Sequence, residues 1–309
     1  MPADTLLSSL AAPVRPLPSA AAGPPARPEG RPMIEAHGSD PVGLALRALA
    51  AGQPLEVLDV GGGSGTRAVP LAVDGCRVTV VDPSMDALAT LRRRAAEAGV
   101  ADRVRGVQAD TDALGGAVPD AAADLVLCHH VLESVDDPVL ATAAMAGALK
   151  PGGTLSLLVA GRQAAVLALS IAGRFSEAAA AASSVDGRFG VADPLCRRYD
   201  IDSVTALLTS ADLVIDSVRG VNVVSGLVPG AVLQDLQHSL DQLAALDEQL
   251  CSTPPFRDIA ADLHVVATRD PVRPDTDQQA RTVAPGVRPA GSNRRAGDQS
   301  DTGDPARSG

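Results

Sequence analysis

The sequence predicts an α/β fold built on a parallel sheet, and three observations carry this prediction. Short runs rich in β-branched residues alternate with longer stretches rich in Ala and Leu, the pattern of strand, helix and strand in series. Glycine clusters and Asp-Pro pairs separate these runs, where loops turn and helices begin. The pattern occupies residues 31–270, about 240 residues, a length compatible with one domain.

Five short runs are expected to form parallel strands joined by right-handed crossovers. They are LEVLDV, CRVTVV, RVRGVQ, ADLVLC and GTLSLLVA, at 55–60, 76–81, 103–108, 123–128 and 153–160. The second crossover begins with an Asp-Pro-Ser cap and is expected to be helical over 82–99, and the fourth begins with Asp-Pro and is expected to be helical over 137–150. The third connection, 109–122, is short for a full helix.

The rest of the chain divides into a helical insertion, a leucine stripe and two tails. The insertion is expected at about 161–200, followed by a helix over 202–210. Leucines at helical spacing, Leu233, Leu236, Leu240, Leu243 and Leu250, predict a helix that packs on its own sheet, although such a stripe can also serve a dimer. Residues 1–30 and 271–309 are rich in Pro, Ala and Gly without a period and are expected to be disordered tails.

The composition of the chain indicates which kinds of partner and which cellular compartment to expect. The chain has 26 basic and 37 acidic side chains, a net charge of −11, one Tyr, three Phe and no Trp. These numbers argue against a broad basic face and against aromatic platforms that stack nucleic-acid bases. The four cysteines lack paired spacing, so neither a disulfide framework nor a bound metal is expected. No apolar run approaches the roughly 20 residues of a membrane span, so we expect no membrane association and a cytoplasmic protein.

The strongest chemical signal is the glycine-rich loop LDVGGGSG at 58–65, directly after the first strand and before a helix. Glycines permit a tight turn and close approach of a ligand, and the helix N-terminus offers free N–H groups. The residues Asp59, Gly61, Gly63 and Gly65 fit the acidic-x-G-x-G-x-G loop that binds S-adenosylmethionine. The third glycine of the G-x-G-x-x-G dinucleotide loop would fall on Thr66.

Polar residues follow the next three strands at the same expected edge of the sheet. Asp82 ends the second strand, Asp110 follows the third, and His129 and His130 follow the fourth. Because open parallel sheets bind ligands at the carboxyl ends of their strands, Asp82 can accept both ribose hydroxyls and Asp110 can meet an adenine amino group. A helix cap or a solvated loop is the alternative for each residue alone, but their joint order favours one binding site.

The motifs LDVGGGSG, VDPS, QADTDAL, LVLCHHVLESVDDP and LKPGGTLSLLV resemble those of the class I S-adenosylmethionine-dependent methyltransferases, over nearly the whole 31–270 core. This resemblance implies a Rossmann-like seven-stranded sheet with the last strand antiparallel, and 213–224 and 259–268 look like the closing pair. It also implies a cofactor site. Its residues would be Asp59, Gly61, Gly62, Gly63 and Gly65 at the methionine end, Asp82 at the ribose, Asp110 at the adenine and His129 at the inner face.

The sequence is also similar to the transfer RNA 5-carboxymethoxyuridine methyltransferases, through HHVLESVDDP, the Gly173-Arg174-Phe175 turn and RDIAADLHVVATR. That similarity implies a carboxylate acceptor on a transfer RNA. The segment SEAAAAASSVDGRFGVAD carries few charges where that group looks more basic, which together with the net charge favours a small or locally held acceptor. Arg31 and Arg47 are the candidates for the arginine that touches the cofactor in that group.

Methyl transfer from a sulfonium is an in-line displacement that depends on positioning and desolvation and requires no metal. On the acceptor side, His130 and Glu133 are candidates for a general base, which an amine or hydroxyl acceptor would need. In the insertion, Arg197, Arg198 and Tyr199 are candidates for an anion clamp, with surface arginines as the alternative.

Two other functions are compatible with the same sheet. A nicotinamide-dependent oxidoreductase is disfavoured by the glycine spacing and by the lack of a plausible Tyr-x-x-x-Lys pair. A catalytically silent protein that binds the cofactor or a partner is the second alternative. The sequence is compatible with a monomer and with a homodimer.

Overall fold

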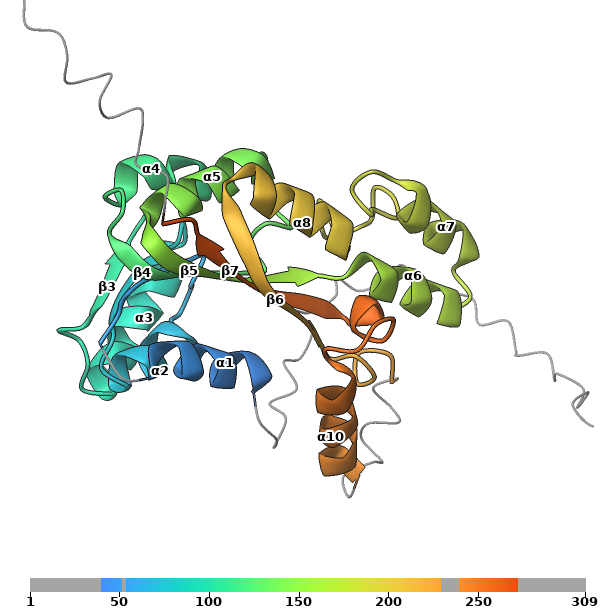
Figure 1. Ribbon diagram of the computed structural model, residues 1–309, viewed down its shortest axis with the longest axis horizontal. Helices are drawn as coiled ribbons and strands as arrows, with labels where there is room; N and C mark the ends of the chain where they lie inside the picture. The colour runs from blue at the N-terminus through green and yellow to red at the C-terminus, as the bar shows by residue number, and fades with distance from the viewer. Residues whose placement is uncertain (1–39, 52–53, 229–238, 272–309) are drawn as a thin grey trace, which may run out of the picture.

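The computed structural model describes residues 40–51, 54–228 and 239–271, which fold around one seven-stranded sheet (Figure 1). The strands are β1 Glu56–Val60, β2 Arg77–Val81, β3 Val104–Val107, β4 Ala123–His129, β5 Leu149–Ala160, β6 Leu213–Val221 and β7 Asp262–Arg269. Their spatial order is β3-β2-β1-β4-β5-β7-β6. The pairs from β3 to β5 are parallel, and β7 is antiparallel to both of its neighbours, so the predicted sheet is confirmed.

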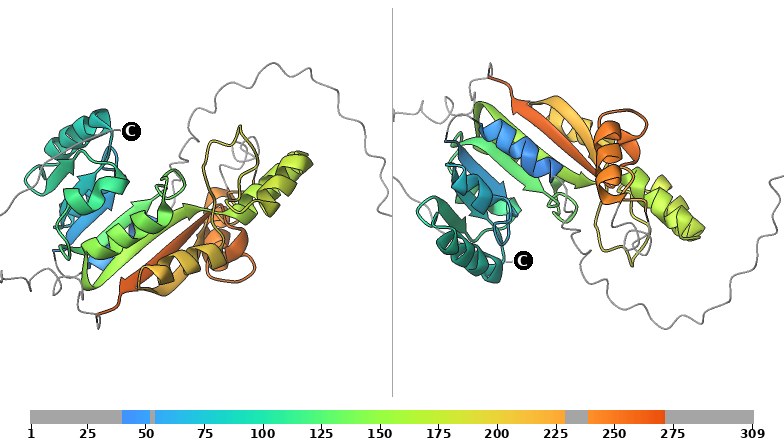
Figure 2. Two further views of the ribbon diagram at one scale, coloured as in Figure 1. Left: turned by 90° about the horizontal axis from the view of Figure 1, so that it is seen from above. Right: turned by 90° about the horizontal axis from the view of Figure 1, so that it is seen from below.

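Helices cover both faces of this sheet, as the three views show (Figures 1 and 2). One face carries α1 Pro41–Ala50, α2 Ala68–Val73 and α3 Met85–Glu97, and the other carries α4 Leu114–Ala117, α5 Pro138–Ala148 and α8 Ile201–Ser210. Two separate apolar cores result, one on each face of the sheet. Short 3-10 helices, η1 Thr111–Ala113 and η3 Arg257–Ile259, complete the connections.

Side-chain caps set where several of these helices begin. The Ser84 hydroxyl accepts the Ala87 N–H and starts α3, while Asp137 accepts two N–H groups at the start of α5. The predicted helix over 137–150 ends earlier than expected, at Ala148, because the chain enters β5 at Leu149. The connection over 109–122 holds only η1 and α4, as its shortness indicated.

Strand alternation decides which polar side chains share a face of the sheet. Successive strand residues point to opposite faces. In β1, Leu58 and Val60 belong to the core beneath α5 and α8, whereas Val57 belongs to the core beneath α1, α2 and α3. Asp59 therefore faces the side of α1 and α2, and the same reasoning along β4 places His129 on that side.

The predicted insertion is present, and the leucine stripe behaves differently from expectation. Two helices, α6 Arg162–Ile171 and α7 Phe175–Ser183, extend beyond the carboxyl end of β5 (Figure 1). The stripe forms α10 Leu240–Leu250, which contains no buried residue and stands away from the sheet (Figure 1). The prediction that it packs on its own sheet is therefore wrong for Leu240, Leu243 and Leu250, which are only partly buried, and α10 meets β6 through the ion pair of Glu248 with Arg219.

Several sequence predictions concern residues that the structure does not describe. The two stripe positions Leu233 and Leu236, residue Arg31, and the tails over 1–30 and 272–309 lie outside the described ranges. Within the ranges that are described, no helix is both long and apolar enough to cross a membrane.

Candidate active site

The glycine loop turns at the carboxyl end of β1 through three residues with left-handed backbone. The φ angles of Gly61, Gly63 and Gly65 are 68°, 54° and 80°, a region in which a side chain is strained. Gly62 has another reason to lack a side chain, because a Cβ there would lie 2.4 Å from the carboxylate carbon of Asp59. The loop therefore covers the Asp59 carboxylate directly.

Asp82, at the end of β2, links this loop to the helix that follows. Its Oδ2 accepts the Gly63 N–H at 2.9 Å and its Oδ1 accepts the Ser84 N–H at 2.8 Å. Each carboxylate oxygen can accept more than one hydrogen bond, so both retain capacity for a ligand hydroxyl. The predicted ribose role is compatible with this geometry.

Asp110 follows β3, two strands from the glycine loop in the order of the sheet. Its side chain is exposed and does not cap η1. The carboxylate is therefore open to a ligand that extends from Asp82 along the carboxyl edge, as the predicted adenine contact requires.

Asp59 lies beneath the loop with an unsatisfied oxygen. The residue is only 3% exposed, and its Oδ2 is buried without a hydrogen-bond partner. Burial raises the pKa of Asp59 to about 7, with the Arg67 charge opposing this shift and the Asp82 charge adding to it. A buried polar atom without a partner is costly, so a donor or cation from a ligand would be stabilised here.

His129 occupies the end of β4 beside the glycine loop, one residue beyond the pairing of Val60 with Cys128. Its Nε2 lies 3.0 Å from Ser156 Oγ, and its Nδ1 is buried without a partner. Burial, with the neighbouring His264 and Arg67, lowers the pKa of His129 to about 3. The ring is therefore neutral at physiological pH.

Arg67 is the site residue that sequence analysis missed. It is the N-cap residue of α2, it forms an ion pair with Asp40, and its charge affects the pKa of Asp59, His129 and His264. The available signal was its position two residues after the last loop glycine. Of the arginines considered from sequence, Arg47 lies in an exposed ion pair on α1 with Asp74, at 3.4 Å.

These groups match the two charges of an amino acid. Asp59 Oδ2 is an unsatisfied acceptor suited to an α-ammonium group, whereas Arg67 and His129 Nδ1 provide a cation and a polar ring atom for an α-carboxylate. With Asp82 and Asp110 along the same edge, the residues fit a ligand that joins an amino acid to a nucleoside. S-adenosylmethionine has this composition.

The predicted acceptor-side residues His130 and Glu133 contact each other. His130 Nδ1 lies 3.1 Å from Glu133 Oε1, which also accepts the Ala160 N–H at 2.7 Å. Glu133 is 2% exposed, and its Oε2 is buried without a partner. His130 is half-exposed and has left-handed backbone, with a φ of 57°. The pair lies beside His129, so a role near the transferred methyl group remains a prediction.

Arg197 and Tyr199 fasten the insertion to the loop after β4. The Arg197 guanidinium donates to the carbonyl oxygens of Leu132 at 3.1 Å, Asp136 at 3.2 Å and Val135. The Tyr199 hydroxyl donates to the Leu132 carbonyl at 3.2 Å, and burial raises the pKa of this phenol. These contacts are internal to the protein.

The Arg198 side chain also binds groups of the protein itself, within the insertion. Its guanidinium binds both oxygens of Asp193, at 2.5 and 2.9 Å, and lies over the Phe189 ring, 5.1 Å from its centroid. The structure therefore does not assemble the anion clamp expected from Arg197, Arg198 and Tyr199, because neighbouring protein groups already hold these side chains. Sequence alone cannot distinguish a ligand-binding arginine from one that binds its own chain.

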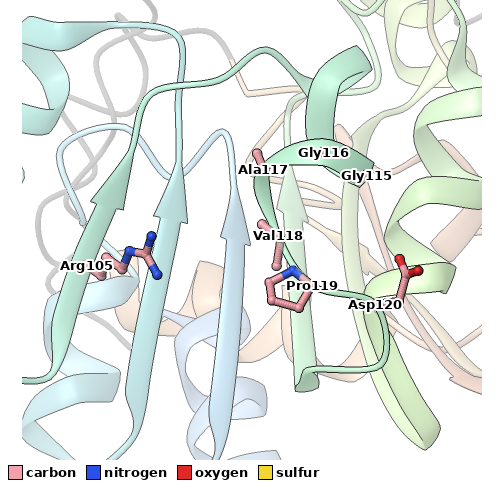
Figure 3. A pocket seen from close by; sticks show the side chains of 7 residues that line it. All are labelled: Arg105, Gly115, Gly116, Ala117, Val118, Pro119 and Asp120. Atoms are coloured by element: carbon pink, nitrogen blue, oxygen red, sulfur yellow. The ribbon is translucent and has the colours of Figure 1, made fainter.

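A surface pocket lies apart from this edge, between β3 and the segment that contains α4 (Figure 3). It is lined by Arg105, Gly115, Gly116, Ala117, Val118, Pro119 and Asp120. None of these residues has a buried polar side-chain atom without a partner. The glycine-loop edge, where such atoms are present, is therefore the better candidate for the active site.

The sheet with its antiparallel seventh strand and the glycine loop after β1 define the class I methyltransferase fold. Residues 58–157 match a family model described as a methyltransferase domain, and the resemblance of the motifs to S-adenosylmethionine-dependent methyltransferases is confirmed.

Curated relatives support the reaction class, and a solved structure shares the fold. A ubiquinone biosynthesis O-methyltransferase from Xanthomonas campestris is 35% identical over 143 residues, 46% of this chain and 59% of that protein. The transfer RNA 5-carboxymethoxyuridine methyltransferase from Escherichia coli is 32% identical over 123 residues, 40% of this chain and 47% of that protein. The chain thus spans about half the length of these curated relatives. A SAM-dependent methyltransferase structure from Methanosarcina mazei shares the fold, with a TM-score of 0.52, 18% identity, and coverage of 73% of this chain and 97% of that one.

Proposed function

We propose that the protein transfers the methyl group of S-adenosylmethionine to a small polar or carboxylate acceptor, either a free molecule or a group on a transfer RNA, in the cytoplasm. The observation that carries this proposal is the pair of unsatisfied buried atoms, Asp59 Oδ2 and His129 Nδ1, on either side of the glycine loop and near Arg67. The O-methyltransferase and transfer RNA methyltransferase relatives support the reaction class.

The bound cofactor supplies an activated methyl group on a sulfonium. In the proposed mechanism, Asp59 binds the α-ammonium group, Arg67 and His129 bind the α-carboxylate, and Asp82 orients the ribose. Held in this way, the cofactor would supply its methyl group for in-line displacement by the acceptor. Holding both partners in line contributes most of the acceleration.

The acceptor determines whether a proton must also move. A carboxylate acceptor needs no base, whereas an amine or hydroxyl acceptor transfers its proton to a nearby group. In the second case, Glu133 accepts the proton at Oε2 while His130 and the Ala160 N–H hold its other oxygen. Because Arg197 and Arg198 are bound within the protein, a small acceptor is favoured over a phosphate-rich one.

Incubation with methyl-labelled S-adenosylmethionine and separated metabolite, transfer RNA and protein fractions tests this function. We expect label in the metabolite fraction first, and label in transfer RNA would identify the other acceptor class. Calorimetry with S-adenosylmethionine and with NAD provides the control, since tight binding of NAD and no heat with S-adenosylmethionine would favour the oxidoreductase. Tight donor binding with no labelled fraction would favour the silent protein.

Replacing Asp82 with alanine is expected to weaken S-adenosylmethionine binding by about 1–3 kcal/mol, because the ribose hydroxyls lose their acceptor. Calorimetry on the folded variant measures this change. Asp86→Ala, at an exposed position in the first turn of α3, is the matched control and should bind normally. Unchanged affinity in Asp82→Ala would remove the ribose assignment.

The affinity for S-adenosylmethionine is expected to rise with pH up to about pH 7, where the Asp59 carboxyl group is ionised and the α-amino group of the ligand is still protonated. Burial raises the pKa of Asp59 to about 7, so the carboxyl group is neutral below that pH and attracts an ammonium group poorly. Affinity should increase by up to about tenfold per pH unit between roughly pH 5 and pH 7. Calorimetry across this range should show the slope, and Asp59→Asn should flatten it. A slope that persists in Asp59→Asn would assign it to another group.

A further inference from the structure

Three polar side chains from three neighbouring strands, two of them buried and His129 partly buried, form a hydrogen-bonded series at the edge of the donor site. Ser156 Oγ in β5 lies 3.0 Å from His129 Nε2 in β4 and 2.8 Å from His264 Nε2 in β7. Ser156 is 0% and His264 2% exposed, and the two rings meet edge to face with centroids 6.1 Å apart. The hydroxyl of Ser156 therefore bridges the two rings.

The number of protons available to His129, Ser156 and His264 couples the tautomers of the two rings. A neutral imidazole has one N–H and one lone pair, and a serine hydroxyl has a single proton to donate. Burial lowers the pKa of His129 to about 3 and that of His264 to about 4, so both rings are neutral. If one ring donates its Nε2–H to Ser156, the hydroxyl donates to Nε2 of the other ring. The two rings therefore hold opposite tautomers.

Charged groups beside the two rings bias the choice between the two arrangements. Arg219 of β6 lies opposite His264 of β7 in the strand register. After burial, the charge of Arg219 has the largest electrostatic effect on the pKa of His264. Arg219 favours a lone pair on His264 Nδ1, whereas Arg67 favours one on His129 Nδ1. The ligand carboxylate that the proposed function places at His129 Nδ1 decides between them, because an acceptor there requires a proton on that atom. The proton of His264 is then on Nε2, the Ser156 hydroxyl donates to His129 Nε2, and the proton of His129 is on Nδ1.

We propose that Ser156 and His264 are positioning residues that hold His129 as its Nδ1–H tautomer, so that the ring presents a neutral N–H donor to the carboxylate of the methyl donor. This role rests on the proposed function for the identity of the ligand. It gives a partner to the one His129 ring atom that is buried and unsatisfied. It also explains why a serine and a histidine 108 residues apart are buried together.

Nitrogen NMR of the full chain labelled in its histidine side chains tests the tautomer directly. We expect His129 to carry its proton on Nδ1 and His264 on Nε2. Ser156→Ala and His264→Leu should each abolish the uniform Nδ1–H state of His129. Ser156→Thr, which keeps the hydroxyl, and His264→Gln, which keeps an N–H donor, should restore it. A proton on Nε2 of His129 in the unmodified protein would overturn the proposal.

Binding measurements separate this role from a purely structural one. Ser156→Ala should lower the affinity for S-adenosylmethionine about tenfold, the loss expected for one hydrogen bond to a charged group. An analogue of S-adenosylmethionine that lacks the carboxylate should bind to Ser156→Ala and to the unmodified protein with equal affinity. The His129 N–H has no partner on that analogue. Equal losses for both ligands would show a structural role and overturn the proposal. If the unmodified protein binds neither ligand, the proposed function fails, and the tautomer measurement alone decides the inference.

Discussion

Gly65→Val is expected to destabilise the domain by about 3–5 kcal/mol and to abolish donor binding. Gly65 has a φ of 80°, where a β-branched residue is strained, and a Cβ there would lie 2.2 Å from Leu91 Cδ1. Leu91 is fully buried in the core beneath α1, α2 and α3, so it cannot withdraw without disturbing its neighbours. Backbone strain and overpacking each cost about 1–3 kcal/mol. Urea denaturation measures the stability, and calorimetry measures the binding.

Gly75→Val is the matched control for this substitution. Gly75 also has left-handed backbone, with a φ of 106°, but nothing lies within 4 Å of a Cβ at that position. The control should lose only the strain term of about 1–3 kcal/mol and should still bind S-adenosylmethionine. Equal losses in both variants, with binding retained in both, would show that the contact with Leu91 is unimportant.

Asp193→Ala is expected to destabilise the protein by about 3–5 kcal/mol, because it leaves the Arg198 charge buried without a partner. The Asp193 and Arg198 side chains are 0% and 9% exposed. Burial opposes ionisation of Asp193, but Arg198 and two backbone N–H groups hold its pKa below the usual range. Its contribution is therefore present near neutral pH and is lost as the pH falls below the range in which carboxylates ionise. Urea denaturation at neutral and acidic pH checks both statements.

Two comparisons identify the cause of that loss. Asp193→Ala combined with Arg198→Leu should recover part of the stability, because no unpaired charge then remains. Glu97→Ala removes an exposed partner from Arg93, at 3.4 Å, and should change stability by less than about 1 kcal/mol. If the double variant is as unstable as Asp193→Ala, the lost backbone contacts of Asp193 rather than the buried charge explain the effect.

The sheet was predictable because its signals are local. The five parallel strands lie within a few residues of their expected positions, since β-branched runs and the caps at Ser84 and Asp137 act over short stretches of chain. The start of β5 at Leu149 was missed because Lys150-Pro151-Gly152-Gly153 marks a helix end but does not exclude an extended chain. The failure of the leucine stripe has a different cause, because helical period cannot show which surface a helix meets.

The donor side of the site was more predictable than the acceptor side for the same reason. Asp59, the loop glycines and Asp82 lie in short loops at strand ends, so their order along the chain gives their positions. The contact between Ser156 and His264 depends on the register of β5 against β7, which the sequence does not specify. Arg197 and Arg198 illustrate a third limit, because their residue type predicts an anionic or carbonyl partner but not whether the protein itself provides it.

The strand order has a consequence for synthesis on the ribosome. Strand β7 lies between β5 and β6, so β6 emerges before β7, the strand with which it pairs. Domains tend to fold as the chain emerges from the ribosome, with N-terminal parts first. Here β6 cannot pair until residues 262–269, which form β7, have been synthesised. His264 arrives with that strand. A nascent chain can therefore contain the complete glycine loop while still lacking the group that orients His129, which would delay productive donor binding until translation has passed β7.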